Sequence, residues 1–176
     1  MSPLFHDPPF DANDPPDKEG YDTAQICLNG HCINSSYIEY PEHNEEFCSS
    51  CGQPTITACK KCTAPIRGYL RGSYPSPYIV PSFCYKCGAP YPWTENRLSV
   101  AVEMAKELDG LNDEERNQLA ASLDDLVREG PRTSLAATRF KKLITKAGGV
   151  AGETFKKVLV DIASETAKKM LWPDAR

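Results

Sequence analysis

Apolar positions after residue 93 recur every three or four residues, the spacing of one helix face. A first helix is expected to end before Gly110, with Thr94 or Asn96 as its N-cap. A second is expected to open at Asn112, continue with acids in its first turn, and end before Gly130. The inward positions are Leu98, Ala101, Val102, Ala105 and Leu108 in the first, and Leu119, Leu123, Leu126 and Val127 in the second.

The same spacing continues to the end of the chain. Thr133 or Ser134 is the expected cap of a third helix that closes at Gly148. A fourth is expected from about Glu153 to Leu171. The short connections favour a small bundle of about four helices over residues 94–176. Its remaining inward positions are Leu135, Phe140, Leu143 and Ile144, then Phe155, Val158, Leu159, Ile162, Ala163, Thr166 and Met170.

Residues 21–93 lack this period. Short β-prone runs at Thr23–Ile26, Tyr37–Tyr40 and Thr55–Thr57 alternate there with cysteine pairs and glycine turns, which predicts small antiparallel sheets. Residues 1–20 are rich in proline and acid and are expected to be a disordered tail; a proline-rich ligand for a partner is the alternative.

Charge alternates along the chain in blocks. The net charge is −9 over residues 1–52, +5 over 53–97, −5 over 98–133 and +5 over 134–176. Such alternation favours contacts between segments over a single basic field directed at nucleic acid. The N-terminus shows no secretory signal and no stretch is apolar enough to span a bilayer, so a cytoplasmic protein with reduced thiols is expected.

In a reducing compartment, eight cysteines indicate metal binding before disulfides. Three C-x-x-C pairs, in which one tight turn directs two thiolates at one ion, carry the signal, and two are followed by glycine. A fourth ligand pair lies in the run Cys27-Leu28-Asn29-Gly30-His31-Cys32, where Cys27 can pair with His31 or with Cys32. The three pairs are Cys48/Cys51, Cys59/Cys62 and Cys84/Cys87.

Two ways of combining the four pairs remain. Sequential use joins the first pair with Cys48/Cys51, and Cys59/Cys62 with Cys84/Cys87, giving two tandem ribbons. Interleaved use would give a cross-brace, but seven residues separate Cys51 from Cys59, which is more than such modules have, so sequential pairing is preferred. A thioredoxin-like redox role is disfavoured because no C-x-x-C opens a helix of a βαβ unit.

The order C-x-x-G-H and then C-x-x-C resembles the knuckles of bacterial treble-clef and zinc-ribbon modules, and this implies that His31 is a ligand and Cys32 is spare. The chain from about Tyr21 to Leu171 is similar to a bacterial family of double-zinc-ribbon proteins of unknown function. That resemblance implies two ribbons, residues 22–56 and 57–92, followed by helices. It departs at Cys32, where an apolar residue is expected. The runs that carry it are Ile26–His31, Phe47–Gly52, Ala64–Gly68, Phe83–Gly88, Tyr91–Thr94 and Leu135–Lys142.

The expected fold is therefore α+β, with two zinc ribbons over residues 21–93 and a helical region over 94–176. Two Zn²⁺ per chain are expected to be structural, because four protein ligands close each site. No enzyme is expected: His6 lies in the tail, and His43 lies in a polar loop where a solvated side chain is a simpler interpretation than a general base. The expected ligands are Cys27, His31, Cys48, Cys51, Cys59, Cys62, Cys84 and Cys87.

Two surfaces could bind a partner. The first is the second ribbon, where cations alternate with tyrosines as in nucleic-acid-binding surfaces, although the tyrosines could equally cover a small core. The second is the C-terminal pair of helices, basic beside apolar faces, which favours helix packing or a protein interface over a membrane surface. We expect a non-enzymatic scaffold or adaptor that binds a protein or itself, with nucleic-acid binding as the alternative. The first surface comprises Lys60, Lys61, Arg67, Arg71 and Lys86 with Tyr69, Tyr74, Tyr78, Tyr85 and Tyr91.

Overall fold

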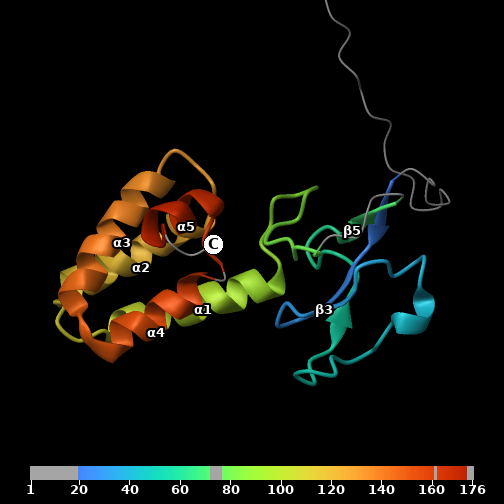
Figure 1. The fold of residues 1–176 in the computed structure, drawn as a ribbon, viewed down its shortest axis with the longest axis horizontal. Helices are drawn as coiled ribbons and strands as arrows, with labels where there is room; N and C mark the ends of the chain where they lie inside the picture. The colour runs from blue at the N-terminus through green and yellow to red at the C-terminus, as the bar shows by residue number, and fades with distance from the viewer. Residues whose placement is uncertain (1–19, 72–76, 161, 174–176) are drawn as a thin grey trace, which may run out of the picture. The chain divides into compact units, whose positions relative to one another are not determined.

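The computed structural model describes residues 20–71, 77–160 and 162–173, apart from the side chains of 149–151 (Figure 1). The chain divides into two compact units, Met1–Pro81 and Ser82–Arg176. Short strands form the first and helices dominate the second, so the α+β prediction is confirmed. The expected tail, residues 1–20, lies outside the described residues except for Gly20.

The first unit contains two small antiparallel sheets. One pairs β1 (Tyr21–Thr23) with β5 (Arg67–Leu70). The other places β2 (Gln25–Cys27) between β3 (Cys32–Asn34) and β4 (Thr55–Ile56). A single 3₁₀ turn, η1 (Pro41–His43), follows β3 among the described residues. Because these strands are two to four residues long, they cannot be stable without additional cross-links.

Buried polar side chains hold the long connection after β3 in place. Asp22, 2% exposed, accepts the N–H groups of Ile38 (3.0 Å) and Glu39 (3.1 Å) and lies 3.5 Å from the Arg71 guanidinium. The Gln25 amide donates to the Glu45 carbonyl and accepts the Glu45 N–H. Backbone groups that have no strand partner are thereby satisfied by side chains.

The sequence predicted the strands only in part. The run Thr55–Thr57 contains β4, and Thr23–Ile26 overlaps β1 and β2, which Ala24 separates. The expected strand at Tyr37–Tyr40 is wrong: these residues form a turn whose N–H groups bond to Asp22. The β-prone side chains there were overridden by a tertiary contact with a buried carboxylate.

The second unit contains five helices among its described residues. They are α1 (Pro92–Glu107), α2 (Asp113–Val127), α3 (Thr133–Ala147), α4 (Gly149–Val160) and α5 (Glu165–Leu171) (Figure 1). Their apolar faces meet in one core, which includes Leu119, Leu123, Phe140, Phe155 and Leu159. Trp172, just beyond α5, packs against this core. The second unit therefore buries a hydrophobic core of its own.

The expected fourth helix is two helices. Residues 162–164 interrupt it, and the Ser164 N–H donates to the Leu126 carbonyl at the end of α2 (2.9 Å). The Ser164 hydroxyl then accepts the Ala167 N–H and caps α5. Ser is a strong N-cap, and the contact with Leu126 completes the stop. The spacing of apolar residues indicates neither of these two interactions, so the break between α4 and α5 was not predicted.

Helix caps were predicted with mixed success. Asn112 caps α2 as expected, in a capping box with Glu115. The caps at Thr94 or Asn96 are wrong because α1 starts at Pro92, and Thr94 lies in its first turn, where its hydroxyl donates to the Ser82 carbonyl. The N-cap of α3 is Arg132, one residue before the expected Thr133 or Ser134.

No helix within the described residues is long and apolar enough to cross a bilayer.

Candidate metal centre

Each C-x-x-C pair lies in a knuckle of the same backbone design. The residue before the first cysteine forms a bridge with a proline seven positions later: Phe47 with Pro54, Ala58 with Pro65, and Phe83 with Pro90. The pairing brings the two ends of the loop together, as in a hairpin. The chain thus repeats an eight-residue unit three times, and the proline that closes each copy was not singled out in the sequence.

Hydrogen bonds inside each knuckle fix the direction of the two thiols. The N–H of the first cysteine donates to the carbonyl five residues later, at 2.8 Å in all three copies. The N–H four residues after that cysteine donates back to the cysteine carbonyl, at 2.7–2.9 Å. The first cysteine of each pair is buried, whereas the second is more exposed.

The first knuckle and the loop after β2 bring one imidazole and three thiols together. The ligand atoms of Cys27, His31, Cys48 and Cys51 all lie within 4.8 Å of one another. His31 Nδ1 is 3.6 Å from Cys27 Sγ and 3.5 Å from Cys48 Sγ, and the sulfurs of Cys27 and Cys51 are 3.8 Å apart. A tetrahedral ion with ordinary thiolate and imidazole bond lengths requires edges of about 3.8 Å between sulfurs and about 3.6 Å between sulfur and nitrogen.

These separations exclude a disulfide in the structure. A disulfide requires sulfurs at about 2.0 Å, far shorter than the separation of Cys27 and Cys51. The four side chains converge instead on a common centre, as metal ligands do. The first tetrad therefore has the geometry of a closed four-coordinate site.

Local hydrogen bonding favours the thiolate form at Cys48. Desolvation raises the pKa of Cys48, but the N–H groups of Ser50 and Cys51 and the His31 ring oppose it and bring the pKa to about 6. Burial raises the pKa of Cys27, against the N–H groups of His31 and Asn29. A cation bound here would compensate the negative charge of a Cys27 thiolate and so favour its deprotonation.

The other two knuckles supply a second tetrad. The sulfurs of Cys59, Cys62, Cys84 and Cys87 also lie within 4.8 Å of one another. Four thiols and no imidazole make this the softer of the two donor sets. The structure thus groups the ligand pairs in sequential order, with Cys27/His31 beside Cys48/Cys51 and Cys59/Cys62 beside Cys84/Cys87.

Cys32 lies outside both tetrads. It is exposed on β3, one residue after His31, and its thiol is not among the ligand atoms that converge at either site. His43 is exposed on η1, with its ring 3.8 Å from the Glu42 carboxylate, and His6 lies outside the described residues.

This placement predicts opposite outcomes for two neighbouring substitutions. Cys32→Ser is expected to leave the metal content unchanged, whereas His31→Ala is expected to lower it by one ion per chain. The reason is that His31 supplies a fourth ligand and Cys32 supplies none. Metal analysis of the two purified variants measures this. Loss of an ion from Cys32→Ser, with retention by His31→Ala, would assign the fourth ligand to Cys32.

Thr63 occupies a position that glycine holds in the other knuckles. Its φ is +60°, and the equivalent Gly52 and Gly88 have φ of +70° and +68°. A β-branched residue is strained in this region, by about 1–2 kcal/mol. Sequence reasoning noted the trailing glycines but missed that Thr63 takes the same conformation, although the aligned position after the second cysteine held the signal.

We therefore expect Thr63→Gly to stabilise the protein, by less than about 1 kcal/mol because the glycine also gains freedom in the unfolded chain. Urea unfolding, with metal release as the readout, measures the change in the free energy of unfolding. Gly52→Ala is the reciprocal variant. It is expected to destabilise the protein because alanine disfavours the positive φ of this position; an added Cβ meets no atom within 4 Å, so a clash would not contribute. If Thr63→Gly lowered the free energy of unfolding, contacts of the threonine side chain would more than offset its backbone strain.

Much of the basic and aromatic set of the second ribbon is engaged inside the protein. Tyr91 is 1% exposed and stacks on Trp93, and the Tyr78 hydroxyl donates to the Arg67 carbonyl. Arg71 lies against Asp22. Tyr74 lies outside the described residues. The exposed members include Lys60, Lys61, Tyr85 and Lys86, each located between two cysteines of a knuckle.

Comparison with known proteins identified a family. A family model described as "Uncharacterized protein conserved in bacteria (DUF2321)" matches residues 20–171. Searches of curated proteins and of solved structures found no match.

Proposed function

The chain belongs to this bacterial family, DUF2321, and we propose that it is a non-enzymatic zinc-stabilised scaffold in the cytoplasm that binds another protein. The observation that carries the proposal is the closure of both tetrads by protein side chains. In such a protein the metal shapes a surface and takes no part in a reaction.

Zinc is the metal that best fits the two donor sets. Three thiolates with an imidazole, and four thiolates, are both common structural zinc sets. Calcium and magnesium prefer oxygen ligands, which neither tetrad offers. A tetrahedral four-thiolate site also suits iron, so the metal content of the purified protein separates the two.

The donor set also argues for a structural role. A catalytic zinc keeps one position for water and acts as a Lewis acid. Here four protein ligands fill the coordination of a tetrahedral ion at each site, and seven of the eight are thiolates that donate charge to the metal. Both features support a metal that cross-links the fold, because a filled and electron-rich site leaves no place to activate a substrate.

Exposed apolar side chains support protein binding. Phe47 is 61% exposed in the first unit and Ile79 is 86% exposed, while Leu135 in α3 is 49% exposed. Aromatic side chains are enriched at the centres of protein interfaces, whereas single exposed aliphatic residues are common on any protein surface, so Phe47 carries most of this support. The C-terminal helices, basic beside such groups, are the surface that we propose for a partner or for self-association.

Nucleic-acid binding is the second candidate, because Lys60, Lys61 and Lys86 are exposed at knuckle tips beside Tyr85. It is the weaker one because Tyr91 is buried and Arg71 is paired. Fluorescence anisotropy of single- and double-stranded oligonucleotides against increasing salt tests it. Salt-sensitive binding that Lys60→Glu weakens would favour this candidate over the scaffold.

Crosslinking inside the native bacterium tests the scaffold directly. We expect reproducible crosslinks from the chain to one or a few proteins, or to a second copy. The matched control is Cys59→Ser, which breaks the second tetrad: it should remove any crosslinks made by residues 20–71 and leave those made by the C-terminal helices, whose core does not include the tetrads. Crosslinks no different from those of an unrelated protein of similar abundance would contradict the proposal.

A further inference from the structure

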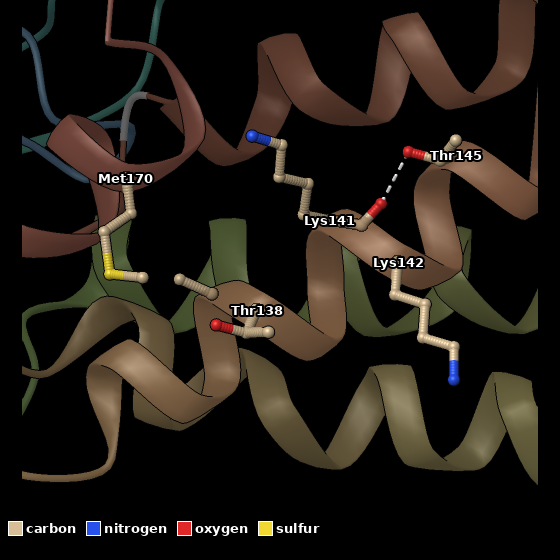
Figure 2. A pocket seen from close by; sticks show the side chains of 6 residues that line it. Thr138, Lys141, Lys142, Thr145 and Met170 are labelled. Carbon is tan, nitrogen blue, oxygen red and sulfur yellow. Dashed lines mark hydrogen bonds between the residues drawn. The ribbon is translucent and has the colours of Figure 1, made fainter.

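A groove of about 550 Å³ opens on the second unit, along α3 and beside α5. Figure 2 shows Met170 of α5 at one side of it, Thr138 near its centre, and Lys141 and Lys142 extending in opposite directions from α3. The helices that form it pack directly against each other. Its lining consists of Ala137, Thr138, Lys141, Lys142, Thr145 and Met170.

The groove combines apolar and cationic character. Ala137, Thr138 and Thr145 line it from α3, with Ala137 only 1% exposed at its base, and Met170, 37% exposed, offers a flexible thioether. The Thr145 hydroxyl donates to the Lys141 carbonyl at 2.8 Å (Figure 2). Methionine adapts to varied apolar partners, and such side chains are frequent on surfaces that bind peptides.

The charge that α3 contributes to the groove has a single sign, and the nearby carboxylate of Glu115 in α2 interacts with Lys146 and, more weakly, with Lys142. α3 carries Arg139, Lys141, Lys142 and Lys146 and contains no acidic residue. The ion pair formed by Lys146 is with Glu115 of α2, whereas Lys141 and Lys142 form no ion pair with any described residue. The two exposed lysines therefore place positive charge at the groove without a carboxylate within ion-pair distance among the described residues.

We propose that this groove binds an acidic segment of a partner protein, with carboxylates at Lys141 and Lys142 and one apolar side chain against Met170. The proposal rests on the scaffold function and names the chemistry of its partner. Charge complementarity selects the acidic segment, because opposite charges would flank the apolar contact on both sides.

Other occupants fit less well. A second copy presenting the same face would place cations against cations around a twofold axis. A nucleic acid would meet lysines but no aromatic ring in the lining on which a base could stack. A small ligand would find no convergent set of polar groups to fix its orientation.

Selection of displayed random peptides against the full-length zinc-loaded protein tests the proposal. The enriched peptides should carry acidic residues on both sides of an aliphatic or aromatic one. After synthesis with a fluorophore, their affinity should fall about tenfold or more for the double variant Lys141→Glu/Lys142→Glu, and also for Met170→Glu. Affinity should fall with added salt, because the lysines are exposed.

The matched control is Lys106→Glu/Lys157→Glu, which makes the same change in net charge at exposed lysines of α1 and α4. It should bind the peptides within about twofold of the wild type. Circular dichroism of all variants should coincide, since the substituted lysines are exposed. The control could lose as much binding as the groove variant. That result would show that the net charge of the protein, not the groove, determines the affinity, and it would overturn the proposal.

Three further outcomes overturn it. Enriched peptides without acidic residues, or no enriched peptide at all, would contradict the proposal that the groove recognises an acidic segment. Peptides that bind the groove variants as tightly as the wild type would move the site elsewhere and leave the scaffold function standing. Self-association in sedimentation velocity that only the groove variants lose would assign the groove to a second copy. The scaffold function itself fails only if crosslinking in cells finds no partner.

Discussion

Removal of the metal is expected to unfold the cysteine-rich unit while the five described helices stay folded. In the first unit, the buried apolar residues other than cysteines are few and small: Ala24, Ile26, Ala64 and Ile66. Cys27, Cys48 and Cys59 fill much of the remaining core. Without an ion these sulfurs lie close together with no bond between them, so the unit loses the cross-links that offset its chain entropy.

The second unit provides the contrast. Its core joins residues from all five helices and includes Leu119, Phe140, Phe155 and Leu159, each at most 1% exposed. Structural zinc contributes on the order of 10 kcal/mol in small domains, which is comparable to the whole free energy of unfolding of a folded protein. Hydrophobic burial holds the helices together and does not depend on the ion.

Hydrogen exchange with mass spectrometry, before and after a strong chelator, measures this directly. Peptides within residues 20–71 should lose protection, and those within residues 113–147 should keep it. Far-UV circular dichroism should retain most of its helical signal. Adding back zinc is the control and should restore protection in the first unit. Protection that persists there without metal would mean that the tetrads are not structural.

Gly68→Ala is expected to be the most destabilising small substitution in the first unit. A Cβ at position 68 would collide with the carbonyl oxygen of Ser35 and lie 2.9 Å from the carbonyl oxygen of Asp22. These are backbone atoms fixed by the pairing of β1 with β5 and by the Tyr69 N–H bond to Ser35. They cannot move without loss of those bonds, so we expect a cost of about 3 kcal/mol or more.

Urea unfolding with metal release as the readout measures the cost of Gly68→Ala. Gly130→Ala is the matched control, because no atom lies within 4 Å of its Cβ and its φ is not in the left-handed region. It should be neutral or slightly stabilising. A Gly68→Ala protein as stable as the control would show that the strand backbone separates there without penalty.

The metal-ligating residues were more predictable from the sequence than the strands and turns that position them. Cysteine spacing is set by the turn that brings two thiols to one ion, so the four pairs are visible in the sequence. The choice between His31 and Cys32 came from resemblance, since spacing alone allowed both. The structure places His31 within the tetrad and leaves Cys32 outside it, exposed on β3.

Helix location followed from apolar spacing, but the interruption before α5 did not. The buried stripe continues across it from Phe155 to Ala167, whereas Met170, expected to face inward, is 37% exposed. The stop depends on the contact of Ser164 with Leu126, which lies 38 residues earlier in the chain. Likewise, the turn at Tyr37–Tyr40 depends on Asp22, a buried carboxylate whose acceptors are used by a distant loop. Local sequence does not encode such partners.

The central claim is that two closed tetrads hold structural zinc. Elemental analysis with X-ray absorption at the zinc edge tests it most directly. We predict two zinc ions per chain whose nearest neighbours are seven sulfurs and one nitrogen across both sites, at about 2.3 Å and about 2.0–2.1 Å. Fewer than two ions, another metal, or an oxygen neighbour from an exchangeable water would contradict the claim.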